Sequence, residues 1–415
     1  MSRRLLALLI VALAGLTACG RYATAPAAGG YRLFLQGGFT GNEQVSVLDS
    51  GTGAVERQLP IGTPAPDWSR YYVVTHLTDS ARLSALDPVT GHTLAQSSIP
   101  AGYQLPNLGQ GPTAGLSPNG QWLVLTRAMG GTTSFLVGAS SLSRSFATVQ
   151  LKGDYTFDAI SNDGQSLYLI QKMGDPNHYQ VRLYDLASQS LAVQPIADKR
   201  EPSEPMNGIR GDSLADPHGN YVFTVYARSN GPFIHALPLG QPLAWCLDLP
   251  AKNKANLEEQ FQWSLATNPG GSLIYAVNGS SGFIAEIAPD KLPSLRRTGQ
   301  LAAINATPGP LDGLVMNTEA KGARIGGAAL SADARTIFTF GATGVLAIDT
   351  GTFKVRAHYL DPWQPDTMRL SADGRWLYVA EAGESKLWLV DPVTGAAAEV
   401  KGVTNPWALL WATPK

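Results

Sequence analysis

A short motif that recurs along the chain limits its possible folds more than any other feature. The clearest copy is a tight turn, Ala372-Asp373-Gly374, followed by the apolar run Trp376-Leu377-Tyr378-Val379. Asp-Gly before such a run predicts a β-hairpin, because Gly tolerates a positive φ and Asp bonds its own backbone. A strand that is apolar at every position predicts that both of its faces are buried.

The whole unit extends from Leu370 to Val400, and the part after Val379 is expected to form the third and fourth strands. Leu387-Trp388-Leu389-Val390 predicts the third strand, and Asp391-Pro392-Val393-Thr394-Gly395 after it predicts a turn. We therefore expect each unit to form four antiparallel strands, one before the Asp-Gly turn and three after it. Six further turns precede apolar strands at residues 71–74, 122–125, 167–170, 221–223, 273–277 and 336–338. The turn before the last of these, Ala332-Asp333-Ala334, lacks the Gly.

The number of third strands differs from the number of turns between first and second strands. Seven turns are found, but third strands can be placed in eight units. The first segment, residues 31–61, begins at the second strand of a unit, and residues 405–411 look like a first strand with nothing after it. The two ends of the chain complete one unit if they pair.

The units resemble the YVTN-type repeats of bacterial β-propeller proteins. The resemblance rests on LSADGRWLYVAE, ATNPGGSLIYAVN and the Asp-x-x-Thr turns that begin at Asp49, Asp87, Asp349 and Asp391. We therefore predict an all-β fold, a single β-propeller domain over residues 31–415 with eight four-stranded antiparallel blades. Seven blades are the alternative, because the repeat spacing is uneven. Pairing of the terminal strands closes the ring and leaves no bare face. The polar insert 253–261 predicts one helical turn.

The N-terminus differs from the rest of the chain. Arg3 and Arg4 precede an apolar run that is too short to span a bilayer, and Leu16-Thr17-Ala18-Cys19 follows. This pattern resembles the lipobox of bacterial lipoproteins. The resemblance implies a signal peptide at 1–18, lipid on Cys19, a flexible tether at 19–30 and export to a membrane of the bacterial cell envelope. An ordinary signal peptide is the alternative. Cys246, the second cysteine, is expected to be a small buried residue.

Charge and motifs argue against several functions. The formal net charge is -1 and the 31 basic residues are scattered, so we expect no nucleic-acid partner. The six histidines fall in different units, without a metal-binding or haem-attachment motif. No Gly-x-Ser-x-Gly elbow or phosphate-binding loop is present. We therefore predict no metal, no cofactor and no catalytic residue.

Loop lengths predict where ligands bind. The long connections lead from one blade to the next or join second to third strands, and in an antiparallel blade these two classes share one face. Long loops in compact domains commonly carry function. Charged and polar residues near the first strands, which line the channel, are candidates for binding a small polar ligand at its mouth. They are Asp158, Arg210, Asp212, Gln262, Arg324, Asp366 and Arg369. Alternatively, they solvate the channel and pair with one another.

These observations favour a monomeric, lipid-anchored binding or scaffold module without catalysis, which binds a protein or small polar ligand through its long-loop face. The alternative is a hydrolase or isomerase at the channel mouth, resembling propeller lactonases. That alternative requires Asp158, Asp212 and Asp366 to lie together rather than each pairing with Arg. A purely structural envelope component is a third possibility.

Overall fold

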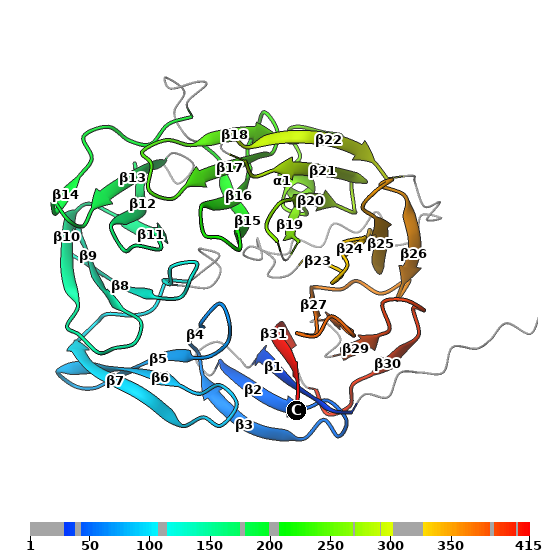
Figure 1. Cartoon of the computed structure of the whole chain (residues 1–415), viewed down its shortest axis with the longest axis horizontal. Helices are drawn as coiled ribbons and strands as arrows, with labels where there is room; N and C mark the ends of the chain where they lie inside the picture. The colour runs from blue at the N-terminus through cyan, green and yellow to red at the C-terminus, as the bar shows by residue number, and fades with distance from the viewer. Residues whose placement is uncertain are drawn as a thin grey trace, which may run out of the picture.

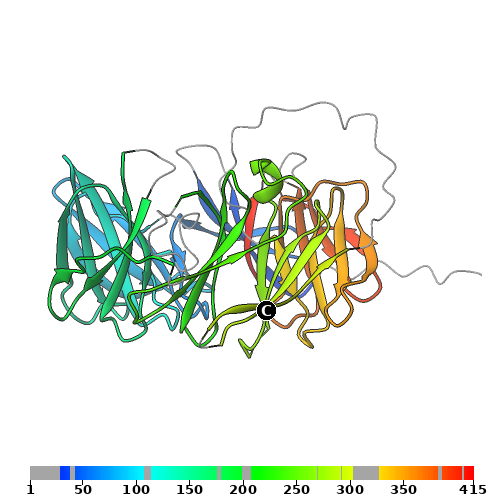
Figure 2. The same cartoon turned by 90° about the horizontal axis from the view of Figure 1, so that it is seen from above.

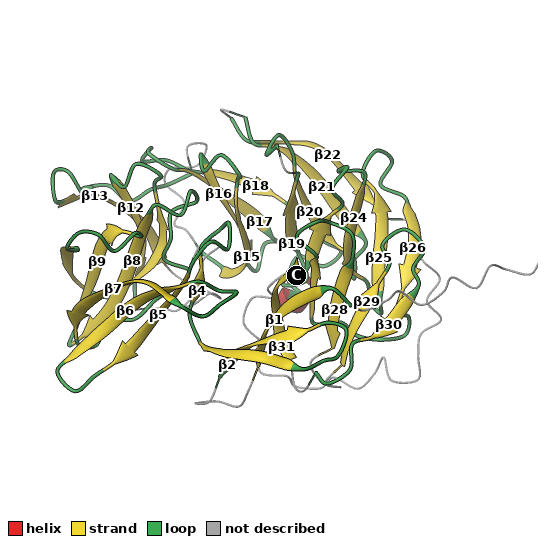
Figure 3. Cartoon of the chain, turned by 60° about the horizontal axis from the view of Figure 1, so that its bottom comes forward, coloured by secondary structure: helices red, strands yellow, loops and turns green. Residues whose placement is uncertain are grey.

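The chain folds into a ring of eight antiparallel β-sheets, as Figure 1 shows for the computed structural model. The structure describes residues 29–37, 43–106, 114–174, 179–198, 207–268, 270–290, 292–301, 327–381, 386–403 and 406–415. The prediction of an eight-bladed propeller is confirmed. Figure 3 shows that strands make up almost all of the regular structure, with one short helix.

The first strand of each blade lies nearest the axis of the ring. From the axis outward, blade 1 contains β31 (Pro406–Pro414), β1 (Tyr31–Gly37), β2 (Gln44–Asp49) and β3 (Val55–Pro60). Blade 2 contains β4 (Thr63–Pro64), β5 (Tyr71–His76), β6 (Ser80–Leu86) and β7 (Thr93–Pro100). Blade 3 contains β8 (Trp122–Met129), β9 (Thr132–Ala139) and β10 (Ala147–Lys152). Two isolated bridges, Gln104 to Thr126 and Leu116 to Leu123, lie on the inner side of β8. Blade 4 contains β11 (Tyr155–Ile160), β12 (Ser166–Lys172), β13 (Tyr179–Asp185) and β14 (Ser190–Leu191).

Blades 5 to 8 follow the same order. Blade 5 contains β15 (Ile209–Ala215), β16 (Tyr221–Ala227), β17 (Phe233–Pro238) and β18 (Trp245–Asp248). Blade 6 contains β19 (Ser264–Thr267), β20 (Ile274–Asn278), β21 (Phe283–Ala288) and β22 (Ser294–Gln300). Blade 7 contains β23 (Ala328–Leu330), β24 (Thr336–Phe340), β25 (Val345–Asp349) and β26 (Val355–Tyr359). Blade 8 contains β27 (Thr367–Leu370), β28 (Leu377–Glu381), β29 (Lys386–Val390) and β30 (Ala397–Glu399).

The two ends of the chain close the ring, as predicted. The C-terminal strand β31 pairs antiparallel with β1, with Phe34 opposite Trp411, and forms the innermost strand of blade 1. Trp411 stacks on Trp68, with ring centroids 4.7 Å apart, and Phe34 lies 5.1 Å from both rings. This aromatic cluster adds side-chain packing to the backbone pairing at the closure.

Serine and aspartate fix the turns that lead from first to second strands. Ser371 donates to Asp373 at 2.6 Å and accepts from the backbone N–H of Trp376 at 3.0 Å. The following Gly374 has a φ of 69°, which favours Gly. In blade 7 the corresponding residue is Ala334 with a φ of 58°. The turn without Gly therefore keeps the geometry of the others, at the cost of backbone strain.

The core is divided into eight layers rather than gathered in one centre. Each apolar cluster joins side chains of neighbouring blades; Leu33 and Leu409 of blade 1, for example, pack with Tyr378 and Leu389 of blade 8. All five residues of β28 are buried, as predicted for a strand that is covered on both faces. Because neighbouring sheets pack face to face around the ring, the innermost strand of every blade faces the central axis.

The loops fall into two classes on opposite faces. We call the face with the turns between first and second and between third and fourth strands the turn face. The other is the connector face, with the second-to-third loops and the connections between blades. The single described helix, α1 (Leu257–Gln260), stands at the connector face in Figure 2. Asn256 caps it by accepting from the Glu259 N–H, so the prediction of a helical turn is confirmed.

Several predictions fall outside the described residues. They are the signal peptide, Cys19, nearly all of the tether and Arg324. Within the described ranges, no helix is long and apolar enough to cross a membrane.

Candidate functional site

Three of the inner strands carry β-bulges, and three of the candidates, Asp158, Arg210 and Asp212, lie at or beside two of them. The bulge in β11 has Asp158 as its extra residue, and the bulge in β15 places Gly211 and Asp212 opposite the single residue Val225. In β31 the first of two irregularities has Leu410 as its extra residue. A bulge interrupts the alternation of side chains along a strand and redirects them.

Asp158 and Arg210 form an ion pair between blades 4 and 5. Arg210 Nη1 lies 2.8 Å from Asp158 Oδ1, and the Arg210 and Asp158 side chains are 14% and 3% exposed. Arg210 also donates to Ser213 Oγ from Nε and Nη2, each at 3.2 Å. The pair is thus buried and hydrogen-bonded, as a charge removed from water requires.

The bulge in β15 separates Arg210 from Asp212. Arg210 reaches towards blade 4, whereas Asp212 Oδ2 accepts the backbone N–H of Leu265 in blade 6 at 2.8 Å. Asp212 Oδ1 accepts the N–H of Ser213 at 2.9 Å. Burial raises the pKa of Asp212 to about 6, although both amides and the charge of Arg369 favour its ionised form. Within the described part of the chain, Asp212 is therefore held by two backbone amides.

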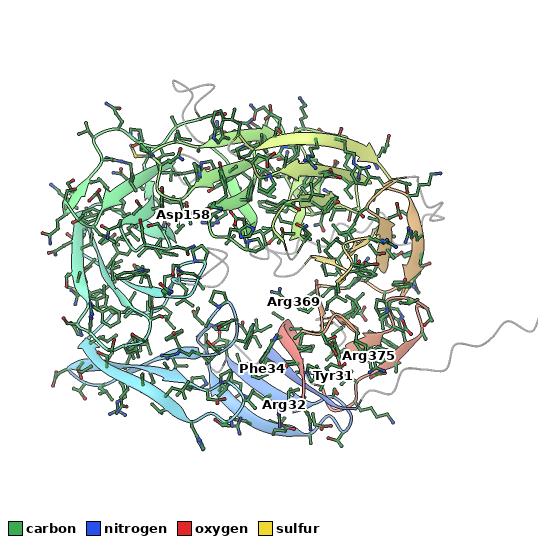
Figure 4. All side chains as sticks on the ribbon, in the orientation of Figure 1. Tyr31, Arg32, Phe34, Asp158, Arg369 and Arg375 are labelled. Carbon is green, nitrogen blue, oxygen red and sulfur yellow. The ribbon has the colours of Figure 1, made fainter. Side chains whose placement is uncertain are left out.

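Arg369 approaches the axis from blade 8. In Figure 4 its side chain extends from β27 towards the centre of the ring. Its Nε donates to Leu409 O of blade 1 at 3.4 Å, beside the bulge in β31. Burial lowers the pKa of Arg369, and the charge of Asp212 opposes that shift. The charges of Asp212 and Arg369 therefore each favour the ionised form of the other group.

The remaining candidates are less closely associated. Gln262 lies in the turn before β19, and its backbone N–H donates to Glu259 O at 3.2 Å. Asp366 lies just before β27, with its backbone N–H bonded to Ala380 O at 2.9 Å. Arg324 lies outside the described residues. Of the seven candidates, the structure thus brings Asp158 and Arg210 into contact.

Sequence reasoning missed a polar row across blade 5. Ser213, Thr224, His235 and Cys246 are successive cross-strand neighbours in β15, β16, β17 and β18. Ser213 Oγ donates to Thr224 Oγ1 at 3.1 Å, and the Cys246 N–H donates to Asp198 Oδ2 at 3.3 Å. The equal spacing of eleven residues is visible in the sequence, but it becomes informative only once the strand pairing is known.

Aromatic and imidazole groups accompany this row. Tyr179 of blade 4 stacks on Tyr226 of blade 5, with ring centroids 5.3 Å apart, and Tyr226 meets His235 edge-on at 6.0 Å. Both tyrosine hydroxyls and His235 Nε2 are buried without a hydrogen-bond partner among the described residues. Burial lowers the pKa of His235 to about 4. The imidazole is therefore neutral in the folded protein at neutral pH.

The described residues do not form an evident metal centre. No group of three or more His, Cys, Asp or Glu side chains in these ranges could hold a metal ion. The inner strands do carry charged side chains, among them the ion pair of Asp158 with Arg210.

The comparisons with known proteins agree on the fold. No family model matches the chain, and a search of curated proteins found no match. Among solved structures, apo AztD from Citrobacter koseri has a TM-score of 0.54 at 12% identity, covering 92% of this chain and 97% of that one. The dihydro-heme d1 dehydrogenase NirN has a TM-score of 0.52 at 13% identity, covering 95% and 77%. At such low identity, these similarities concern the fold alone.

A periplasmic gluconolactonase from Pseudomonas aeruginosa, PpgL, is more distant. Its TM-score is 0.40 at 16% identity, with 81% of this chain and 97% of that one covered. This similarity is too weak to support a lactonase-like activity. The fold defines the protein as an eight-bladed β-propeller with fixed charges on its inner strands.

Proposed function

We propose that the protein is a lipid-anchored binding module of the bacterial cell envelope that captures a partner protein through its connector face without catalysing a reaction. Anchoring through Cys19 rests on the lipobox resemblance. Binding at the connector face rests on where the exposed apolar side chains lie.

More of the exposed large apolar side chains lie on the connector face than on the turn face. Of the eleven large apolar side chains exposed among the described residues, six lie at loops or strand ends of this face: Ile61, Leu77, Met129, Met173, Ile209 and Leu257. Three lie on outer strands or the outer edge, Val55, Leu94 and Val193, and two lie in turn-face loops, Leu292 and Val393. Apolar groups that remain in water favour a partner that covers them.

Hydrogen bonds stabilise both faces in different ways. On the turn face, Asn162 Oδ1 accepts from Asn119 N at 2.9 Å, and Asn162 Nδ2 donates to His218 O at 3.2 Å, which links three successive blades. On the connector face, buried Gln260 bonds the N–H and C=O of Arg228 at 2.8 and 2.9 Å. Gln260 thereby fixes the connection between blades 5 and 6 to a loop of blade 5, which gives a partner a preformed surface.

The contacts of the candidate carboxylates do not favour the alternative of a hydrolase or isomerase. It required Asp158, Asp212 and Asp366 to act together, but Asp158 is paired with Arg210, and Asp212 accepts two backbone amides. These contacts hold the two carboxylates in separate structural roles.

Variants on the two faces test the proposal. The Leu77→Ser/Met129→Ser/Met173→Ser variant changes the connector face, whereas Leu292→Ser/Val393→Ser changes the turn face. Each is expressed in its native host and cross-linked, and its captured proteins are quantified by mass spectrometry. We expect a partner that is lost with the first variant and retained with the second. Equal capture by both variants would refute the proposal. Cys19→Ser should release the protein from the membrane fraction and abolish incorporation of labelled palmitate.

A further inference from the structure

The chain enters the ring at the turn face. Tyr31 is the first residue of β1, the second strand of blade 1. It meets the turn between the third and fourth strands of the same blade, where its C=O accepts the Ser50 N–H at 3.0 Å and its N–H donates to Ser50 Oγ at 3.1 Å. Its hydroxyl bonds Asp373 in the turn between the first and second strands of blade 8. Both turns belong to the turn face, so the segment that precedes Tyr31 joins the ring on this side.

The last residue of the chain fixes this entry point. The backbone N–H of Lys415 donates to Gly30 O at 2.9 Å. Its Nζ bonds Asp49 and lies 2.7 Å from Glu56 Oε1. Glu56 Oε2 accepts from Arg32 Nε at 2.8 Å. Backbone and ionic contacts therefore hold the start of β1 in place at the turn face.

The segment between the proposed lipid and the ring is short. Residues 19–30 join Cys19 to Tyr31. A flexible chain of this length has a root-mean-square end-to-end distance of about 19 Å. Its fully extended length is about 40 Å. The lipid on Cys19 therefore keeps the turn face of blade 1 close to the bilayer.

The opposite orientation needs nearly all of that length. To bring the connector face to the bilayer, the segment has to pass β2 and β3, about 10 Å across. It then has to run along the height of the blade, about 23 Å for the seven residues of β1. The whole path is close to the fully extended length and far beyond the root-mean-square reach, so the entropy of the segment opposes it.

We propose that the turn face lies against the membrane surface and that the connector face opens away from it. This orientation rests on the lipid anchor of the preceding proposal and deepens that proposal, because it places the captured partner on the side of the ring that is turned away from the bilayer. The turn face meets the polar headgroups, since its turns carry carboxylates such as Asp333 and Asp373 that a hydrocarbon layer would exclude.

The test measures the height of the two faces above a bilayer. The lipidated full-length chain is reconstituted in vesicles of phosphatidylethanolamine and phosphatidylglycerol whose headgroups carry an acceptor dye. A donor dye is attached to one introduced cysteine at an exposed position, and buried Cys246 is replaced by Ala in every variant. On blade 3, Arg144→Cys marks the turn face and Met129→Cys marks the connector face. On blade 7, Arg335→Cys and Ala342→Cys mark the same two faces.

We expect stronger energy transfer from both turn-face labels than from both connector-face labels. The eight residues of β8 separate the two faces by about 26 Å, which such transfer resolves. Blades 3 and 7 lie on opposite sides of the ring (Figure 1), so a ring standing on its edge gives transfer that differs by blade rather than by face. Transfer that differs only by blade, or that is equal or stronger from the connector face, overturns the proposed orientation.

Two further variants separate the orientation from the anchor. An insert of about 24 Gly and Ser residues between Pro26 and Ala27 raises the root-mean-square reach to about 33 Å and should reduce the difference between the faces. An unchanged difference would show that the length of the segment does not set the orientation. Cys19→Ser should give no transfer from any label. If this variant binds the vesicles as the parent does, the lipid anchor fails and the orientation fails with it, whereas equal transfer from both faces of an anchored chain overturns the orientation alone.

Discussion

The hydroxyl of Tyr31 donates a 2.7 Å hydrogen bond to Asp373 Oδ2, although 342 residues separate the two. The bond crosses from blade 1 to blade 8, where the ring closes. Beside it, the backbone N–H of Ala372 donates to Ala412 O at 2.7 Å. Burial raises the pKa of Tyr31, and the hydrogen bond to the Asp373 carboxylate acts in the same direction. The closure thus combines strand pairing with contacts between the terminal blades.

Tyr31→Phe should lower the free energy of unfolding by about 1 kcal/mol, the typical net value of one hydrogen bond, or somewhat more because the acceptor is charged. Asp373 keeps its bonds from Ser371 and Arg375, so the turn itself should persist. Urea unfolding followed by tryptophan fluorescence measures the change. Tyr184→Phe removes a hydroxyl from another buried ring and should change stability by less. Equal losses in both variants would contradict a specific role for the closure bond.

Ala334→Gly should stabilise the protein by about 0.5–1 kcal/mol. Ala334 has a φ of 58°, in the left-handed region where a Cβ is strained. The strain that Gly relieves, about 1–2 kcal/mol, exceeds the entropy it adds to the unfolded chain. The reverse change at the corresponding position, Gly374→Ala, should destabilise the protein, and its added Cβ would lie 3.2 Å from Ala332 Cβ. Calorimetric Tm values should move in opposite directions; a shift in the same direction would count against the argument.

The fold could be predicted because its signals are local and repeated. The turn at Ala372-Asp373-Gly374 and the strand after it follow from residue types alone, and the two half-units at the ends of the chain indicate circular closure. The candidate site could be predicted only in part. The sequence marks both Asp158 and Arg210 as candidates, but their pairing depends on bulges in β11 and β15 that no residue pattern indicates. The polar neighbours of His235 come from strand register, which the sequence does not specify.

Breaking the buried ion pair should cost far more than breaking an exposed one. Asp158→Asn leaves Arg210 with little solvent and no carboxylate, so we expect a loss of about 3–5 kcal/mol. In the pair of Arg228 with Asp248, the carboxylate is 78% exposed, and Asp248→Asn should cost below about 1 kcal/mol. Chemical unfolding of both variants measures the contrast. The double variant Asp158→Leu/Arg210→Met should recover much of the first loss, since it leaves neither charge unpaired. Losses of the same size in the two single variants would show that burial does not control the cost.

His235 should make the fold sensitive to mild acid. Its ring is 2% exposed, and burial lowers its pKa from 6.5 to about 4. The charges of Asp158 and Asp198 oppose this shift, whereas that of Arg210 adds to it. Between pH 6.5 and 4, the unfolded chain therefore binds a proton that the folded chain excludes. The contribution of His235 to stability is fully present above about pH 6.5 and is lost as the pH falls towards about 4, by on the order of 3 kcal/mol.

His235→Leu removes this titration and keeps an apolar group in the layer between blades 4 and 5. We therefore expect the variant to lose less stability than the parent protein when the pH is lowered from about 7 to about 4.5. Urea unfolding at several pH values gives the difference between the two proteins, in which the contributions of all other titrating groups cancel. A difference between His235→Leu and the parent that stays constant over this range would show that the imidazole already accepts its proton in the folded state.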